Sequence, residues 1–214
     1  MKVMRIRKLK KRQTKPFKFK PFSPKQQRLL YWWCDGSPVK DYDIILADGA
    51  IRSGKTIAMI CSFLRWSQSG FKDEAFIIAG KSIGALKRNV VKPMLQILEA
   101  WGWKYDFNRS ENYITIGTNT YYLFGANNEA SQDVLQGLTA AGAFADEAAL
   151  FPQSFTDQMI GRCSVDGAKI FMNCNPRGPY HYIKVEFIDK AMEKKIYYIH
   201  FTMDDNLRDR KSVV

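Results

Sequence analysis

One stretch of eight residues has the composition and spacing of a loop that holds phosphate groups. Residues 49–56 read GAIRSGKT and fit the pattern G-x-x-x-x-G-K-[ST] in full. In such a loop, glycines let backbone N–H groups face the phosphates, and the N-terminus of the following helix adds a partial positive charge. Lys55 would reach the β- and γ-phosphates of a nucleotide, and the Thr56 hydroxyl would hold Mg²⁺. The residues expected to bind the nucleotide here are Gly49, Ala50, Ile51, Arg52, Ser53, Gly54, Lys55 and Thr56.

A chance match in a turn is the alternative, and the sequence around the loop argues against it. The apolar run YDIILA at 42–47 predicts a buried strand before the loop, and residues 54–68 have the apolar spacing of a helix. Strand, loop and helix in this order are the context that a phosphate-binding loop requires. A second Gly-Lys-Ser at 80–82 lacks the upstream glycine, since Ala75 stands in its place. Lys81 is therefore interpreted as a surface cation or a DNA contact.

Two adjacent carboxylates follow a short apolar run at 141–145, and they complete the chemistry of a nucleotide site. Asp146 would hold Mg²⁺ through its water shell. Glu147 would polarise a water molecule for attack on the γ-phosphate. Alone, such a pair is commonly just a solvated strand end, but downstream of a phosphate loop it indicates catalysis. The additional glutamate favours ATP hydrolysis, because GTPases use a glutamine placed elsewhere.

Two asparagines lie at the end of another predicted strand, in FMNCNPRGPYHYIK at 171–184. In P-loop ATPases with a catalytic glutamate, the strand after the carboxylate strand is inserted between it and the phosphate-loop strand. That topology places Asn173 or Asn175 beside the γ-phosphate, where either could sense its loss. An ordinary Asn-Pro turn is the alternative, and the sensor role rests on analogy with the fold.

The elements that must position these residues alternate between strands and helices along the chain. This alternation predicts a mostly parallel central sheet flanked by helices. Together with the phosphate loop and the additional glutamate, it makes the expected fold an α/β P-loop NTPase of the ASCE type with a RecA-like core. Strands are expected at 42–47, 75–80, 112–116, 120–125, 141–147, 168–176 and 195–201. Helices are expected within 22–33, at 54–68, at 82–102 with a kink near Pro93, at 152–163 and near 179–192.

The chain has 214 residues and a net charge of +12, but the positive charge is concentrated at one end. Residues 1–20 contain ten lysines and arginines and no acid, whereas the rest contains 23 basic and 21 acidic residues. We expect a basic, disordered arm at 1–21, either solvated or bound to a polyanion, an ATPase domain at 22–207 and a tail at 208–214. No apolar run suits export or a membrane span, and four scattered cysteines do not suggest zinc.

In order and spacing, the segments FSPKQQRLL, GAIRSGKT, LQGLTAAGAFADEAAL and NCNPRGPYHYIK resemble the ATPase domain of the large subunit of tailed-phage terminases. The resemblance implies ATP-driven packaging of double-stranded DNA into a procapsid, in the host cell cytoplasm, by a homo-oligomeric ring docked on the portal protein. A small terminase subunit would be a further partner. The resemblance also implies that Gln26 or Gln27 contacts adenine, that Asn173–Asn175 couples hydrolysis to movement, and that Arg52 acts as an arginine sensor.

The sequence departs from the family pattern in two places. Gln136 stands near the position where some terminases carry an arginine that completes a neighbour's active site. The chain also ends at Val214, before the RNase H-like nuclease domain of the family, so nuclease activity is not expected from it. The rival interpretations are a helicase-like or repair translocase, which would need a second RecA-like lobe, and an inert truncated fragment that binds DNA through its arm.

Overall fold

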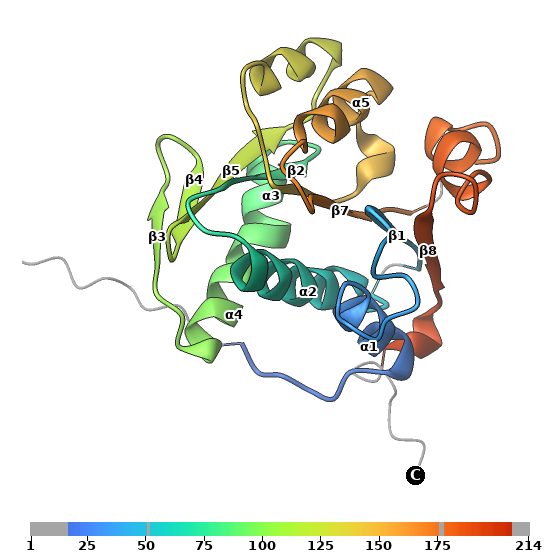
Figure 1. Ribbon diagram of the computed structural model, residues 1–214, viewed down its shortest axis with the longest axis horizontal. Coiled ribbons are helices and arrows are strands. Elements are labelled where there is room, and N and C mark those ends of the chain that lie inside the picture. The colour runs from blue at the N-terminus through green and yellow to red at the C-terminus, as the bar shows by residue number, and fades with distance from the viewer. Residues whose placement is uncertain (1–16, 51, 176–177, 207–214) are drawn as a thin grey trace, which may run out of the picture.

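The computed structural model describes residues 17–50, 52–175 and 178–206, and these residues form one eight-stranded sheet. The strand order is β3-β4-β5-β2-β6-β7-β1-β8 (Figure 1). The six strands from β5 to β8 in this order are parallel, and β3, β4 and β5 pair antiparallel. The strands are β1 Ile44–Gly49, β2 Ala75–Gly80, β3 Tyr105–Asn108, β4 Tyr113–Ile116, β5 Asn119–Gly125, β6 Gly142–Ala145, β7 Lys169–Asn173 and β8 Ile196–Phe201.

Helices cover both faces of this sheet, which confirms the predicted α/β class. The helices are α1 Pro24–Tyr31, α2 Lys55–Gly70, α3 Ile83–Leu86, α4 Lys92–Trp101 and α5 Gln153–Arg162. In Figure 1, α1, α2 and α4 lie on one side of the sheet and α5 lies on the other. The sheet has one hydrophobic core on each face, one shared with α1, α2 and α4 and the other shared with α5. Successive side chains of a strand point to opposite faces, so Phe144 packs in the core with α2 whereas Ala143 and Ala145 pack in the core with α5. The central strands are mostly apolar because both of their faces are buried, and polar residues such as Asp48 and Asn173 stand toward their carboxyl ends.

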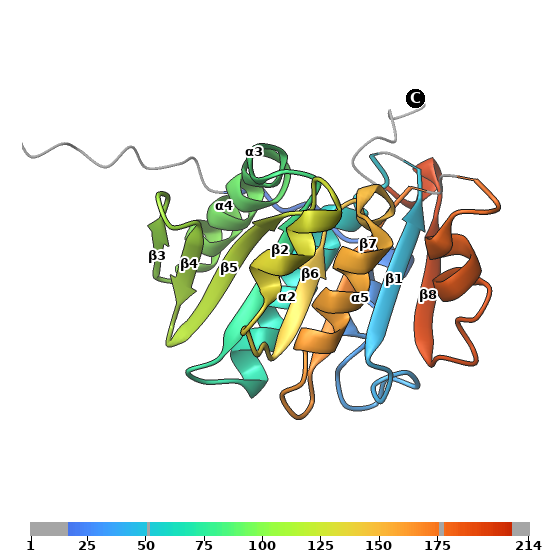
Figure 2. The same ribbon diagram turned by 90° about the horizontal axis from the view of Figure 1, so that it is seen from above.

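The strand order brings together the three segments that the sequence singled out. β7 lies between β6 and β1, as predicted, with Asn173 opposite Ala47 and Met172 opposite Ala145. Since all three strands are parallel, their carboxyl ends meet at one edge of the sheet (Figure 2). The phosphate loop, the carboxylate pair and the asparagine segment all leave the sheet at this edge. Ligands in open α/β sheets bind at such a place.

Several predicted elements differ from the observed ones. The expected kink near Pro93 is a π-helical turn at Lys87–Val91, and Pro93 lies in the first turn of α4. Proline lacks an N–H and its ring crowds the carbonyl four residues earlier, so the wider turn accommodates it. β3 was missed because its Tyr-Asp-Phe-Asn alternation spans only four residues, none of which is buried. The helix expected near 179–192 is a single π-helical turn at Ile183–Ile188 followed by turns.

Residues 17–21, predicted as part of a disordered arm, pack against α4 instead. The backbone N–H of Phe17 donates to the carbonyl of Gln96 at 3.0 Å. The ring of Phe19 stacks parallel to Trp101, with 6.1 Å between ring centroids. Aromatic side chains placed between the lysines therefore tie this segment to the domain, and the predicted boundary at residue 21 is too late. Residues 1–16 lie outside the described residues. No described helix is long and apolar enough to span a bilayer.

The first glycine of the phosphate loop is required by the neighbouring strand. Gly49 has φ +114°, and a Cβ built there would lie 1.9 Å from the carbonyl oxygen of Phe201 in β8. We expect Gly49→Ala to lower the free energy of unfolding by about 2–4 kcal/mol, because it adds overpacking to left-handed strain. Gly36→Ala is the matched control, since Gly36 also has positive φ but its Cβ would meet nothing within 4 Å. Equal losses for the two variants in urea titrations would contradict the role of β8.

Candidate functional site

The phosphate loop connects β1 to α2 as predicted, and Ile51 is its one residue outside the described part of the chain. Gly54 directly precedes α2 with φ +79°, and a Cβ there would lie 2.3 Å from Nε2 of Gln26. The Ser53 hydroxyl is buried and has no hydrogen-bond partner among the described residues. An unpartnered polar atom in this loop suits a ligand that brings oxygen atoms to it.

Lys55 lies at the first position of α2, and its ammonium group is held by acceptors that a nucleotide would replace. Its Nζ donates to the carbonyl oxygens of Gly49 at 3.0 Å and Ala50 at 3.1 Å, and to Oδ1 of Asn175 at 3.0 Å. Burial lowers the pKa of Lys55, and the carboxylates of Asp146, Asp48 and Glu147 oppose this shift. The charge is thus partly desolvated and surrounded by acceptors, as a phosphate-binding lysine requires.

Asn173 contacts both the carboxylate of the predicted metal ligand Asp146 and the backbone of the predicted catalytic residue Glu147. Its Nδ2 donates to Oδ1 of Asp146 at 2.9 Å, and its Oδ1 accepts the backbone N–H of Glu147 at 3.1 Å. The sequence left open whether Asn173 or Asn175 belongs to the site. The structure brings in both, with different partners, because Asn175 contacts Lys55.

Glu147 has an unusual backbone for its residue type. Its φ of +57° is left-handed, and it directly precedes the 3₁₀ turn Ala148–Leu150. A non-glycine residue in this region carries strain on the order of 1–2 kcal/mol, so the surrounding structure must impose the conformation. Such outliers concentrate at functional sites. Its side chain is half-buried.

Asp146 and Thr56 carry the oxygen ligands that Mg²⁺ prefers. Asp146 is buried at the end of β6, and Thr56 lies in the first turn of α2. Burial raises the pKa of Asp146 to about 6, against the opposing effects of the Asn173 hydrogen bond and Lys55, and with a further increase from Glu147. A carboxylate and a hydroxyl are hard oxygen ligands, and a divalent cation would favour the ionised form of Asp146. These residues fit the metal that the loop pattern implies.

The raised pKa of Asp146 makes a prediction for the metal-free protein. The folded-state value of about 6 lies above the ordinary value of 3.8. The contribution of Asp146 to the free energy of unfolding is therefore fully present below about pH 3.8, where its carboxyl is protonated in both states. It is lost as pH rises through about 6. Asp146→Asn, which cannot titrate, should gain stability over wild type on the order of 1 kcal/mol between pH 5 and pH 7.5. Urea unfolding with chelator at both pH values measures this, and a pH-independent difference would refute it.

The two glutamines predicted to contact adenine lie in different environments. Gln26 is buried, caps α1 by accepting the N–H of Ser23 at 3.0 Å, and donates through Nε2 to the carbonyl of Ser53 at 3.0 Å. Gln27 is exposed and donates to the carbonyl of Phe22. Gln26 is thus the one bonded to the phosphate loop. A cavity of about 20 Å³ beside it, lined in part by Gly54 and Ile57, has room for about one water molecule.

Two contacts at the site were missed by sequence reasoning. The Asn206 amide donates to the carbonyl of Arg52, which is an exposed residue with φ +65°. His200 Nδ1 lies 2.7 Å from Oδ1 of Asp48, which is buried just before the loop. A charged residue at the end of an apolar strand was the available signal for Asp48, since buried aspartates are nearly always paired. No local pattern pointed to Asn206.

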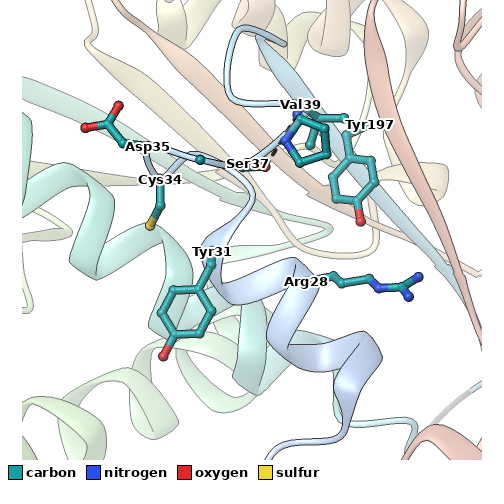
Figure 3. Close-up of a pocket in the computed structure, with 9 residues that line it drawn as sticks. Arg28, Tyr31, Cys34, Asp35, Ser37, Val39 and Tyr197 are labelled. Atoms are coloured by element: carbon teal, nitrogen blue, oxygen red, sulfur yellow. Dashed lines mark hydrogen bonds between the residues drawn. The ribbon is translucent and has the colours of Figure 1, made fainter.

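Another cavity, of about 530 Å³, lies away from the phosphate loop (Figure 3). Arg28 and Tyr31 of α1, the loop around Cys34 and Tyr197 of β8 line it. Tyr197 is the second residue of β8, so this cavity lies toward the amino ends of the strands. The phosphate loop follows the carboxyl end of β1, and none of the described residues predicted to bind the nucleotide lines this cavity.

Comparisons with known proteins agree with this geometry. Residues 46–212 match the family described as terminase large subunit, T4likevirus-type, N-terminal. No curated protein matches the chain. The large terminase of a thermophilic bacteriophage is 52% identical with a TM-score of 0.86, over 91% of this chain and 49% of that one. The complex of that terminase with ATP-γ-S is 49% identical with a TM-score of 0.84, over 90% and 48% of the two chains.

A more distant structure shares the fold. The large terminase ATPase domain of Thermus phage P74-26 is 13% identical with a TM-score of 0.60, over 75% of this chain and 76% of that one. The chain spans about half the length of the 52% identical terminase. The family match covers most of the chain and includes the phosphate loop, both carboxylates and the asparagine segment. The chain therefore belongs to the terminase large-subunit family, and it matches the N-terminal region of that subunit.

Proposed function

We propose that this chain binds ATP with Mg²⁺ at the phosphate loop and hydrolyses it, and that in the complete terminase this reaction drives packaging of double-stranded DNA. The observation that carries the proposal is the bonded set Asp146–Asn173–Glu147 beside Lys55, at the carboxyl edge of three adjacent parallel strands. This set combines a phosphate-binding cation, a metal-binding carboxylate and a water-polarising carboxylate in one place. The structure of the thermophilic phage terminase with ATP-γ-S supports the choice of nucleotide.

Each residue has a defined task in this proposal. Lys55 turns from the loop carbonyls to the β- and γ-phosphates, and Glu147 orients and polarises the attacking water. Thr56 and Asp146 hold Mg²⁺, which neutralises charge on the phosphates when it is bound. Asn175 loses its bond to Lys55 when the lysine turns, so it responds to the nucleotide.

The other binding roles follow from position. Gln26 is the proposed adenine contact, because it bonds to Ser53 of the loop. Arg52 is the proposed arginine sensor, since it is exposed within the loop. Gln27 is the weaker candidate for the adenine contact, because its amide bonds to Phe22.

ATP turnover with and without duplex DNA tests the proposal against its rivals. The family assignment favours packaging over a helicase-like or repair translocase. Magnesium-dependent phosphate release supports the ATPase, whereas DNA binding without any turnover supports an inert DNA-binding fragment. The portal protein, the small terminase subunit, a homo-oligomeric ring and the host cell cytoplasm remain proposals for the whole protein.

Two groups of cations are candidates for the DNA contact. One is the set of eight lysines and arginines in residues 1–16. The other surrounds α3 and the β3–β4 turn, where Lys87 and Arg109 flank the ring of Phe107 at 5.9 Å and 5.7 Å. Exposed cations nearby are Lys81, Arg88 and Lys92.

Removing residues 1–16 should flatten the salt dependence of DNA affinity and leave ATP affinity unchanged. Each neutralised phosphate contributes about −0.9 to the slope of log affinity against log salt, so eight cations on DNA predict a change of several units. Residues 17–21 are kept because Phe19 packs on Trp101. Fluorescence anisotropy on one duplex measures the slope. If removing residues 1–16 leaves the slope unchanged, and replacing Lys81, Arg88 and Lys92 together by alanine flattens it, the folded domain makes the DNA contacts.

A further inference from the structure

The hydroxyl of Tyr182 lies against the turn that follows Glu147. It is 3.2 Å from the carbonyl oxygen of Ala148 and 3.3 Å from that of Phe151. On its other side it is 2.8 Å from the Thr156 hydroxyl of α5. Tyr182 belongs to the connection between β7 and β8, whose side chains pack with those of α5 in one core on the same side of the sheet (Figure 1). One hydroxyl thus joins three segments of the chain.

The Tyr182 hydroxyl is the hydrogen-bond donor to the turn. Burial raises the pKa of Tyr182 to about 12, so the hydroxyl is protonated at neutral pH. A tyrosine has one proton, and only a donor can bond to carbonyl oxygens. The tyrosine donates to the carbonyls of the turn, while the Thr156 hydroxyl has two acceptors within reach, the tyrosine oxygen at 2.8 Å and the carbonyl oxygen of Pro152 at 3.5 Å.

Glu147 is held on one side by the end of β7 and on the other by the connection that follows β7. Before it, Asn173 at the end of β7 accepts its N–H. After it, Leu150 donates to its carbonyl at 2.8 Å within the turn whose Ala148 and Phe151 carbonyls Tyr182 fixes. The left-handed conformation of Glu147 needs such support, because an isolated glutamate avoids it.

We propose that Tyr182 is a positioning residue for Glu147, holding the turn 148–151 so that the carboxylate keeps its place in the site. This role rests on the proposed function of Glu147 as the water-polarising group. It extends the role of β7 and the connection that follows it, because Asn173 contacts Asp146 and the backbone of Glu147, Asn175 contacts Lys55, and Tyr182 contacts the turn.

Tyr182→Phe tests the role, because it removes the hydroxyl and keeps the ring beside Phe187. We expect kcat for ATP to fall about 10- to 100-fold, since a small misplacement of a catalytic group costs that much, while affinity for a fluorescent ATP analogue changes less than about 2-fold. Thr156→Val should give a smaller fall in kcat, again with little change in affinity for the ATP analogue, because a hydrogen-bond partner of the tyrosine is lost. Thr156→Ser, which keeps the hydroxyl, should have the kcat of wild type.

Tyr121→Phe is the matched control. The Tyr121 hydroxyl is also buried and bonded, to Ser67 at 2.7 Å and Gln68 at 2.8 Å, in the core on the other face of the sheet. It should lose stability and keep kcat. Equal falls in kcat for Tyr121→Phe and Tyr182→Phe would mean that lost stability explains both, and would overturn the positioning role of Tyr182.

Two further measurements separate this role from the function on which it rests. Hydrogen exchange of the backbone amides at 147–151 does not depend on turnover, and it should become faster in Tyr182→Phe and stay unchanged in Tyr121→Phe. Unchanged exchange in both variants overturns the proposal. A Glu147→Gln variant that turns over ATP like wild type removes the premise. Wild-type kcat in Tyr182→Phe beside an inactive Glu147→Gln overturns the positioning role alone.

Discussion

Glu147→Gln is expected to lower ATP turnover by about 10²–10⁴-fold and to leave ATP affinity nearly unchanged. The amide keeps the size and shape of the side chain but cannot polarise water as a carboxylate does. The backbone hydrogen bond from Glu147 to Asn173 does not involve the side chain, so the turn should keep its structure. Steady-state phosphate release and binding of a fluorescent ATP analogue measure the two quantities separately.

Glu111→Gln provides the control for this change. Glu111 is exposed in the β3–β4 turn, far along the chain from the site, and the substitution removes the same charge. It should turn over ATP like wild type. If Glu147→Gln does so as well, Glu147 is not the group that polarises the water.

Lys55→Ala is expected to weaken ATP binding by about 10²-fold, because charge-assisted hydrogen bonds to the phosphates are lost. The lysine now bonds to Gly49, Ala50 and Asn175, so its charge is already placed over the loop. Turnover at saturating ATP should also fall, since the lysine contacts the γ-phosphate in the reacting complex. Isothermal titration calorimetry with a non-hydrolysable ATP analogue measures the affinity.

Lys81→Ala is the matched variant for this test. Lys81 lies in the second Gly-Lys-Ser of the chain, which lacks the upstream glycine, and its Nζ is exposed near the carbonyls of Asn127 and Leu150. ATP affinity should be unchanged in this variant. Similar affinities for Lys55→Ala and Lys81→Ala would assign the nucleotide to another place.

The parts of the site that follow short local patterns could be predicted from the sequence. The phosphate loop is recognised because backbone curvature, helix start and lysine are encoded within eight residues. Asp146 and Glu147 follow an apolar run that marks a strand end, and the insertion of β7 follows from the class of ATPase. These features depend on neighbours in sequence or on a fold-level rule.

The remaining contacts join residues far apart in the chain, where no local pattern exists. Asn206 bonds to Arg52 and His200 to Asp48 because β8 pairs in register with β1 across about 150 residues. Tyr182 resembles any aromatic residue of an apolar segment until its hydroxyl is placed on the turn after Glu147. Similarly, the sequence indicates that Gly49 is a phosphate-loop glycine, but it does not reveal that the close approach of the Phe201 backbone also requires a glycine there.

A crystal structure of the chain with Mg²⁺ and a non-hydrolysable ATP analogue tests the central claim most directly. The account predicts the phosphates at residues 49–56, with Lys55 Nζ moved from Gly49, Ala50 and Asn175 onto the phosphates. It also predicts the metal beside Thr56 and Asp146, and Glu147 facing the γ-phosphate. A nucleotide bound elsewhere, or Lys55 still bonded to the loop carbonyls with ATP present, would contradict it.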